Sequence, residues 1–229
     1  MNAKVPLVMI PGTLCTERTF AEQAASLRDA AEPSVQLPVE GPDLEACAAG
    51  ILGRVPERFA LLGFSLGGLV ALTIMRQAPE RVLRLCLLAT NPRGSTPQNL
   101  ETWARWRREV AQGGFPDVIQ AHAAGVYSGN PEARAPVMEM ACAVGPDTFL
   151  KQLDLLGSRP DSRPSLAAIS CPTLLVAGRQ DRVTPPELLE EVQGLIPGSR
   201  LETLPACGHY AALERPRAVT KLLRDWLEA

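Results

Sequence analysis

Residues 61–68 read Leu61-Leu62-Gly63-Phe64-Ser65-Leu66-Gly67-Gly68 and place one serine between two glycines. An apolar run precedes Ser65 and a pattern of helical spacing follows it, so this stretch predicts a sharp turn from a strand into a helix. Glycines are needed two positions before and after the serine because the backbone crowds so tight a turn. The helix behind Ser65 would direct free N–H groups and the positive end of its dipole toward the hydroxyl. By itself the pattern also fits a glycine-rich turn with a capping serine.

The rest of the chain alternates short apolar runs with longer stretches of helical spacing. Six runs are short and rich in leucine or β-branched residues, as buried parallel strands are: 6–10, 34–37, 58–62, 83–89, 173–177 and 200–204. Helical spacing fills most of the gaps, at about 18–30, 43–54, 66–77, 186–194 and 215–228. The alternation predicts an α/β fold, with a mostly parallel sheet of about six strands flanked by helices.

Residues 91–168 break this alternation, because no strand-like run occurs there. The composition is helical, with interruptions at Gly113-Gly114, Pro131, Pro136 and Gly145-Pro146. We expect three or four short helices, inserted as a cap over the edge of the sheet. The chain then divides into a core of residues 1–91 and 166–229 and a helical lid of residues 92–165.

Composition and charge exclude several classes of protein. The 229 residues carry a net charge of -2 with a pI near 5.8, so there is no basic field for nucleic acid or an anionic membrane surface. No apolar stretch reaches the roughly 18 residues that span a bilayer, and residues 1–10 lack the pattern of a signal peptide. The six cysteines form no Cys-x-x-Cys pair, as is typical of reduced thiols in a cytoplasmic protein.

Metal and nucleotide cofactors are not expected. The chain has two histidines, His122 and His209, and no His/Cys/Asp cluster with ligand spacing, so we predict no metal site. Gly12-Thr13-Leu14-Cys15, after the first strand, does not supply the Gly-x-Gly-x-x-Gly pattern of nucleotide-binding enzymes.

If Ser65 is a nucleophile, it needs a base to accept its proton and an acid to orient that base. His209 follows the last predicted strand, whereas His122 lies in the insertion, where a solvated or partly packed role is expected. Asp181 follows the strand at 173–177, so its loop should emerge at the same sheet edge as Ser65 and His209. Asn91, at the end of the fourth strand, cannot carry the charge that stabilises an imidazolium. The predicted catalytic residues are therefore Ser65, Asp181 and His209, in the chain order stated for α/β hydrolases.

With these residues the chain resembles the α/β-hydrolase fold superfamily, as a short single-domain serine hydrolase with a helical lid. The resemblance covers nearly the whole length and is carried by 63–68, 178–181, 208–209 and 214–216. It implies that Glu214 belongs to a structural element that opens the last helix. Many members have two more strands before the first strand seen here, and His-Gly where this chain has Pro11-Gly12. The resemblance also implies oxyanion donors at the Leu66 N–H and at the Thr13 N–H, with Leu14 as the alternative to Thr13.

The insertion carries aromatic and methionine side chains that suggest an apolar pocket or packing of the lid onto the core. Trp103 and Trp106 are three residues apart and share a helix face. We predict that Leu14, Phe64, Trp103 and Trp106 contact the substrate. The arginines at 105, 107 and 108 fit a solvated face better than an anion clamp.

These features predict a serine hydrolase that cleaves a carboxylic ester of small or medium acyl size through an acyl-enzyme on Ser65. The same residues would also serve a thioesterase, an amidase or a C–C bond hydrolase. A non-catalytic binding protein with this fold is the alternative from another class. The expected partner is a small-molecule substrate, with neither nucleic acid nor membrane, and the expected assembly is a monomer or a homodimer.

Overall fold

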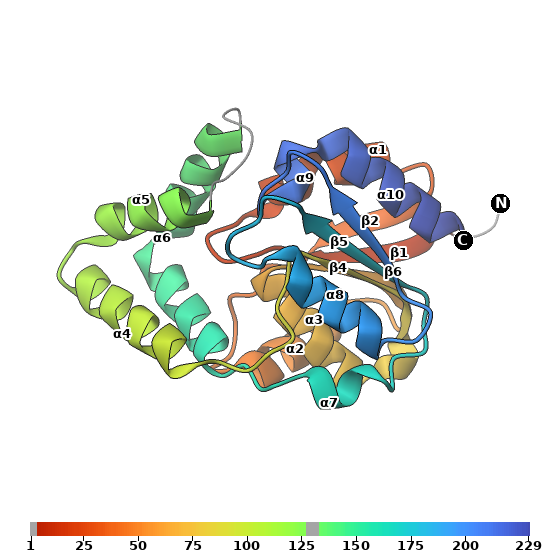
Figure 1. The fold of residues 1–229 in the computed structure, drawn as a ribbon, viewed down its shortest axis with the longest axis horizontal. Helices are drawn as coiled ribbons and strands as arrows, with labels where there is room; N and C mark the ends of the chain where they lie inside the picture. The colour runs from red at the N-terminus through yellow and green to blue at the C-terminus, as the bar shows by residue number, and fades with distance from the viewer. Residues whose placement is uncertain (1–3, 127–132) are drawn as a thin grey trace.

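A computed structural model describes residues 4–126 and 133–229 of the chain, and among these it places one six-stranded sheet. The strand order is β2-β1-β3-β4-β5-β6, and every neighbouring pair is parallel (Figure 1). The strands are β1 Val5–Ile10, β2 Ala31–Val35, β3 Phe59–Phe64, β4 Val82–Leu88, β5 Thr173–Gly178 and β6 Arg200–Leu204. The predicted α/β class and strand number are confirmed.

Alternate side chains of the strands enter two separate cores, because successive residues of a strand point to opposite faces of the sheet. Leu61 and Leu87 pack against the helices α2 (Leu44–Leu52), α3 (Leu66–Gln77) and α8 (Pro186–Leu195). Leu62 and Leu88 pack on the other face, against the helix α10 (Pro216–Glu228) and the short helix α9 (Ala211–Glu214). Figure 1 shows these two helical layers below and above the sheet. The central strands are apolar on both faces, which is why they stood out in the sequence.

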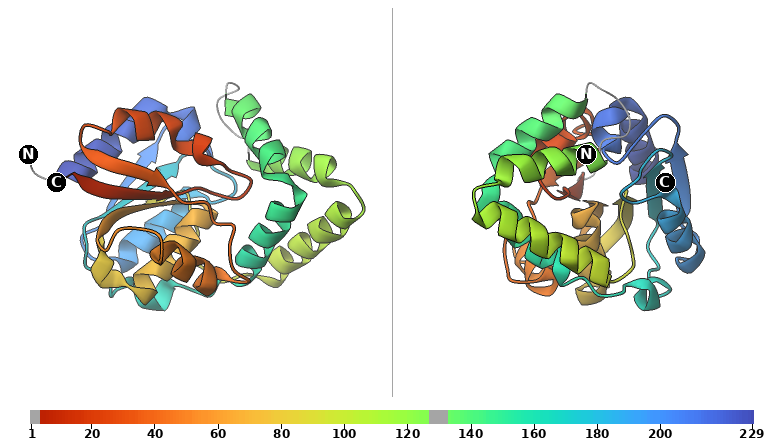
Figure 2. Two further views of the ribbon diagram at one scale, coloured as in Figure 1. Left: turned by 180° about the vertical axis from the view of Figure 1, so that it is seen from behind. Right: turned by 60° about the vertical axis from the view of Figure 1, so that its left-hand side comes forward.

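Three longer helices lie between β4 and β5: α4 (Pro97–Ala111), α5 (Phe115–Val126) and α6 (Arg134–Gly157). They stand together at one end of the sheet in both views of Figure 2. Thr96 begins α4 with a capping box to Asn99, and α6 is kinked at Gly145, whose φ is 74°. Gly145, with a ψ of 169°, is not helical, so α6 consists of two helical segments in series, and the interruption predicted at Gly145-Pro146 ends the first segment and begins the second. Pro131 lies outside the described residues, and the division into core and lid stays a prediction.

Two predicted elements differ from the structure near the N-terminus. The strand expected at 34–37 is β2, Ala31–Val35, which begins three residues earlier. It is the edge strand, so it tolerates Pro33 and exposes Glu32, and its sequence lacks the apolar run that marks a buried strand. The helix expected at 18–30 is shorter, consisting of the 3-10 turn η1 (Glu17–Phe20) and α1 (Ala21–Ser26), because the chain must leave it in time to pair Ala31 with Val5.

The remaining elements are short. They are the 3-10 turn η2 (Pro79–Arg81) before β4 and the helix α7 (Arg163–Leu166) before β5. Over the described ranges, no helix is both long and apolar enough to cross a membrane.

Candidate active site

Ser65 lies between β3 and α3, at the turn that the sequence predicted. Its φ of 52° and ψ of −114° place a non-glycine residue in a strained conformation. A Cβ on Gly63 would lie 2.4 Å from the carbonyl oxygen of Gly67, and a Cβ on Gly67 would lie 2.0 Å from that of Ile10. Both glycines are therefore required by close backbone approach, and the turn raises the Ser65 side chain above the carboxyl end of the sheet.

His209 and Asp181 lie beside Ser65, as their positions after β6 and β5 predicted. Nε2 of His209 is 3.0 Å from Oγ of Ser65, and Nδ1 of His209 is 2.7 Å from Oδ2 of Asp181. His209 is 3% exposed and Asp181 4% exposed, so the contact between these two side chains is shielded from water. The imidazole ring also contacts Phe64, with ring centroids 5.1 Å apart. The three side chains form one hydrogen-bonded series.

Asp181 accepts hydrogen bonds from its own loop as well as from His209. Oδ1 accepts from the N–H groups of Val183 and Thr184, at 2.8 and 3.0 Å, and Oδ2 accepts from the Thr184 hydroxyl at 2.7 Å. Burial favours the neutral acid, but His209 and the Thr184 donors outweigh it, so the pKa of Asp181 is lowered. The carboxylate is therefore held ionised, in the form that can orient and stabilise an imidazolium.

The loop that carries His209 is held by buried Glu214. Its carboxylate accepts from the N–H of Gly208 at 2.8 Å and from the N–H of Tyr210 at 3.1 Å. A Cβ at Gly178 would lie 2.1 Å from the carbonyl oxygen of Gly208, so β5 and this loop are in close contact. Glu214 therefore fixes the backbone on either side of His209, which agrees with the structural role that the resemblance implied.

Two N–H groups near Ser65 have no acceptor among the described residues: those of Thr13, after β1, and of Leu66, the first residue of α3. The N–H of Leu14 instead donates to Oε1 of Gln152 in α6, at 2.9 Å. Of the two candidates after Gly12, Thr13 therefore keeps the free donor.

Leu14 was predicted to contact the substrate, but it is not among the residues that line the cavity beside Ser65. Its side chain is 1% exposed and packs with Val118, Phe149 and Leu153 of the inserted helices. Its φ of 57° turns the chain there, away from the cavity beside Ser65. Leu14 thus contributes to the packing of α5 and α6 onto the loop after β1.

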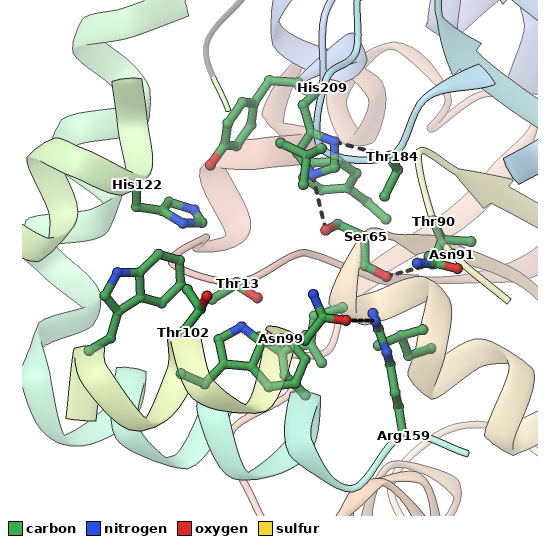
Figure 3. A pocket seen from close by; sticks show the side chains of 18 of the residues that line it. Thr13, Ser65, Thr90, Asn91, Asn99, Thr102, His122, Arg159, Thr184 and His209 are labelled. Carbon is green, nitrogen blue, oxygen red and sulfur yellow. Dashed lines mark hydrogen bonds between the residues drawn. The ribbon is translucent and has the colours of Figure 1, made fainter. Parts of the chain in front are cut away.

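A cavity of about 340 Å³ lies between the carboxyl ends of the strands and the inserted helices. Phe64, Trp103 and Trp106 line it, as predicted, together with Ser65 and His209. Figure 3 shows the labelled side chains Thr102, Asn99 and Arg159 around the same space. Thr90, which follows β4, makes a contact that the sequence does not predict. Its hydroxyl donates to the carbonyl oxygen of Ser65 at 2.8 Å and so supports the Ser65 turn.

His122 was expected to be solvated or partly packed, and the structure places it in the cavity wall instead (Figure 3). Its ring lies edge-on to Trp106, with centroids 5.7 Å apart. Burial, with a smaller contribution from His209, lowers the pKa of His122 to about 4, so its imidazole is neutral at pH 7. The signal in the sequence was its spacing, because His122 follows the buried Val118 and Ile119 by four and three residues.

The arginine in the cavity is also not one of those singled out in the sequence. Arg105 and Arg107 are exposed and pair with Glu109 and Asp154. Arg159, two residues beyond α6, lines the cavity, donates to Oδ1 of Asn99 at 3.0 Å and lies over the Trp103 ring at 5.5 Å. Burial lowers the pKa of Arg159, yet an arginine side chain stays charged in proteins.

A family model described as alpha/beta hydrolase fold matches residues 56–216, which include the Ser65 turn, Asp181 and His209. The chain belongs to the α/β-hydrolase fold family. Among its relatives, a pimeloyl-[acyl-carrier protein] methyl ester esterase of Neisseria meningitidis is 29% identical over 210 residues, covering 81% of this chain and 75% of that protein. A protein of the same name from Nitrosomonas europaea is 32% identical over 178 residues, covering 72% of this chain and 70% of that one.

Two solved structures share this fold. A thermophilic esterase from Thermogutta terrifontis, malate bound, superposes with a TM-score of 0.89 at 26% identity, over 99% of this chain and 90% of that chain. The enol-lactonase of Burkholderia xenovorans LB400 superposes with a TM-score of 0.87 at 21% identity, over 99% of this chain and 93% of that chain. At this identity the similarity supports the fold and nothing further.

Proposed function

We propose that this α/β hydrolase cleaves carboxylic esters of small or medium acyl size through an acyl-enzyme on Ser65. The observation that carries the proposal is the hydrogen-bonded series Ser65–His209–Asp181 at the wall of a cavity. A serine hydroxyl is a weak nucleophile unless a base lies within hydrogen-bond reach. The distances of 3.0 and 2.7 Å meet that requirement for the base and for the acid that orients it.

In the first half of the reaction, Oγ of Ser65 attacks the carbonyl carbon while Nε2 of His209 accepts the hydroxyl proton. Asp181 stabilises the imidazolium, and the N–H groups of Thr13 and Leu66 donate to the developing oxyanion, each worth roughly 3–4 kcal/mol. The C–O bond then breaks and His209 returns the proton to the leaving alcohol. In the second half, His209 activates a water that cleaves the acyl-enzyme, releasing the acid and restoring Ser65.

The relatives and the cavity support an ester as the substrate. The relatives of Neisseria meningitidis and Nitrosomonas europaea are named methyl ester esterases, and the Thermogutta terrifontis structure is of an esterase. A cavity of about 340 Å³ with Phe64, Trp103 and Trp106 in its wall suits a small or medium organic group.

We propose that residues 92–165 act as the lid of this site on a core of residues 1–91 and 166–229. The helix α4 supplies Trp103 and Trp106 to the cavity wall, and α5 supplies His122. The lid would hold the substrate against Ser65 and limit the access of water.

The test is the intact mass of the protein after exposure to a fluorophosphonate probe, for wild type, Ser65→Ala and Ser199→Ala. We expect one adduct on wild type and on Ser199→Ala, whose serine bonds the Ile196 carbonyl away from the cavity, and none on Ser65→Ala. A matched panel of ester, thioester and amide substrates then identifies the bond that is cleaved. Folded wild type that takes up no probe and cleaves none of the panel would contradict the proposal.

A further inference from the structure

Arg159 is a cation in the cavity wall, and no anionic side chain in the described part of the chain pairs with it. Across the described residues, no carboxylate lies within 4.0 Å of its guanidinium, and its Nε is buried with no hydrogen-bond acceptor. Among the described residues that line the cavity there is neither an aspartate nor a glutamate. Leaving a charged group partly buried and unneutralised costs stability, and a bound anion would offset that cost.

The neighbours of Arg159 orient it without neutralising it. Trp103 lies under the guanidinium and Asn99 accepts from its Nη2, but the ring and the amide are both uncharged. Arg107 provides the contrast, since it lies on the outside of α4 and is paired with Asp154 at 2.6 Å. The planar guanidinium therefore keeps donors available for a second, charged acceptor.

Asn99 adds a further donor at the same place. Its Oδ1 accepts from the N–H and the hydroxyl of Thr96, at 3.1 and 2.9 Å, and from Arg159 at 3.0 Å. These three donors fix the orientation of the amide, so its Nδ2 must point the other way. Asn99 lines the cavity, and in Figure 3 its nitrogen is directed away from Arg159 toward the space below Ser65. That nitrogen has no acceptor among the described residues.

We infer that Arg159 and Asn99 form a carboxylate-binding subsite in the cavity, so that the preferred substrate is an ester that also carries a free carboxylate. This inference rests on the proposed function, because it names the class of ester that the site takes. A carboxylate matches the fork of a guanidinium and would be held by charge-assisted bonds. His122 is neutral at pH 7, so the positive charge on this wall of the cavity comes from Arg159.

The first test compares kcat/KM for pairs of esters that differ only in the carboxylate. One pair carries it on the acyl side (a monomethyl dicarboxylate against the methyl alkanoate of equal length), and the other carries it on the alcohol side (an O-acyl hydroxy acid against its amide). Chain length is varied in both series. We expect wild type to prefer the anionic member of one series by about 10- to 100-fold, and that series identifies the part of the substrate bound by Arg159.

Three variants assign the preference to the subsite. Arg159→Gln removes the charge, and Asn99→Asp supplies a carboxylate next to Arg159 while keeping an acceptor for Thr96. Both should bring the ratio of kcat/KM for the anionic ester to kcat/KM for its neutral partner close to 1, whatever the change in the activity on the neutral ester itself. Arg107→Gln, a matched substitution outside the cavity, should keep the wild-type preference. Wild type without any anionic preference, or equal loss on both esters in Arg159→Gln, would overturn the inference.

A binding measurement separates this inference from the proposed function. Ser65→Ala is titrated calorimetrically with the same anionic and neutral esters, with and without Arg159→Gln. Tighter binding of the anionic ester that disappears with Arg159→Gln supports the subsite even if wild type cleaves no ester. Turnover by wild type with equal binding of both esters would overturn the subsite and leave the proposed function standing.

Discussion

The hydroxyl of Thr184 donates a 2.7 Å hydrogen bond to Oδ2 of Asp181, the same oxygen that contacts Nδ1 of His209. Thr184 Oγ1 also lies 3.2 Å from that nitrogen. Thr184→Val keeps the shape of the side chain and removes this donor, so the Asp181 carboxylate is less well held. We expect kcat on a neutral ester to fall about tenfold, equal to about 1.4 kcal/mol in the barrier. Steady-state kinetics and a thermal melt check this, and an unchanged kcat would show that Thr184 only packs.

Asp181→Asn tests the charge behind His209. The amide has nearly the same size but cannot stabilise an imidazolium and favours the wrong tautomer, so we expect kcat to fall by about 10³–10⁴-fold. Asp161→Asn is the matched control, because Asp161 is paired with Arg163 at the surface. Its kcat should equal that of wild type. Comparable losses in both variants would mean that the effect is on folding, which urea titration of each would reveal.

The fold could be predicted because its strands carry strong local signals. The strands β3, β4 and β5 are apolar on both faces except for Arg84 in β4 and Thr173 in β5. The predicted start of the edge strand β2 differs from the observed start by three residues. The strand is partly solvated and contains Pro33, so its apolar pattern is weak. Parallel strands also bring their following loops to one edge of the sheet, which is why the sequence alone predicts that Ser65, Asp181 and His209 lie together.

The wall of the cavity could not be predicted in the same way. His122 and Arg159 belong to the insertion, and no local pattern says how an inserted helix is placed over a sheet. Arg159 follows α6 in a loop with no periodicity, and its position depends on the kink at Gly145 and on packing against Trp103. The prediction that Leu14 contacts the substrate is wrong because the chain has a φ of 57° there, and the side chain packs between the loop after β1 and α6.

His122 makes the stability of the protein depend on pH. Its pKa is about 4 in the folded protein, against about 6.5 in the unfolded chain. Between these values the unfolded chain binds a proton that the folded protein does not, so the free energy of unfolding decreases as the pH falls, by at most about 1.4 kcal/mol per pH unit. Urea titrations from pH 7 to pH 4.5 should give a steeper fall for wild type than for His122→Gln. Parallel curves would contradict the lowered pKa, and NMR titration of the His122 ring would report it directly.

The last prediction concerns the glycines of the Ser65 turn. A Cβ at Gly67 would lie 2.0 Å from the Ile10 carbonyl oxygen and 2.7 Å from that of Pro11, and both are backbone atoms that cannot rotate away. Gly67→Ala should therefore lower the free energy of unfolding by about 3 kcal/mol and displace the loop that carries the Thr13 N–H, so that kcat falls as well.

Gly194→Ala is the matched control for this change. Gly194 lies near the end of α8, and apart from its own helix backbone and chain neighbours a methyl group on its Cα would meet none of the described residues within 4 Å. Alanine there should therefore raise the free energy of unfolding by about 0.5 kcal/mol. Urea denaturation and ester turnover of the two variants give the comparison. If Gly67→Ala were as stable and as active as Gly194→Ala, the close approach of α3 to β1, and with it the geometry assigned to Ser65, would be incorrect.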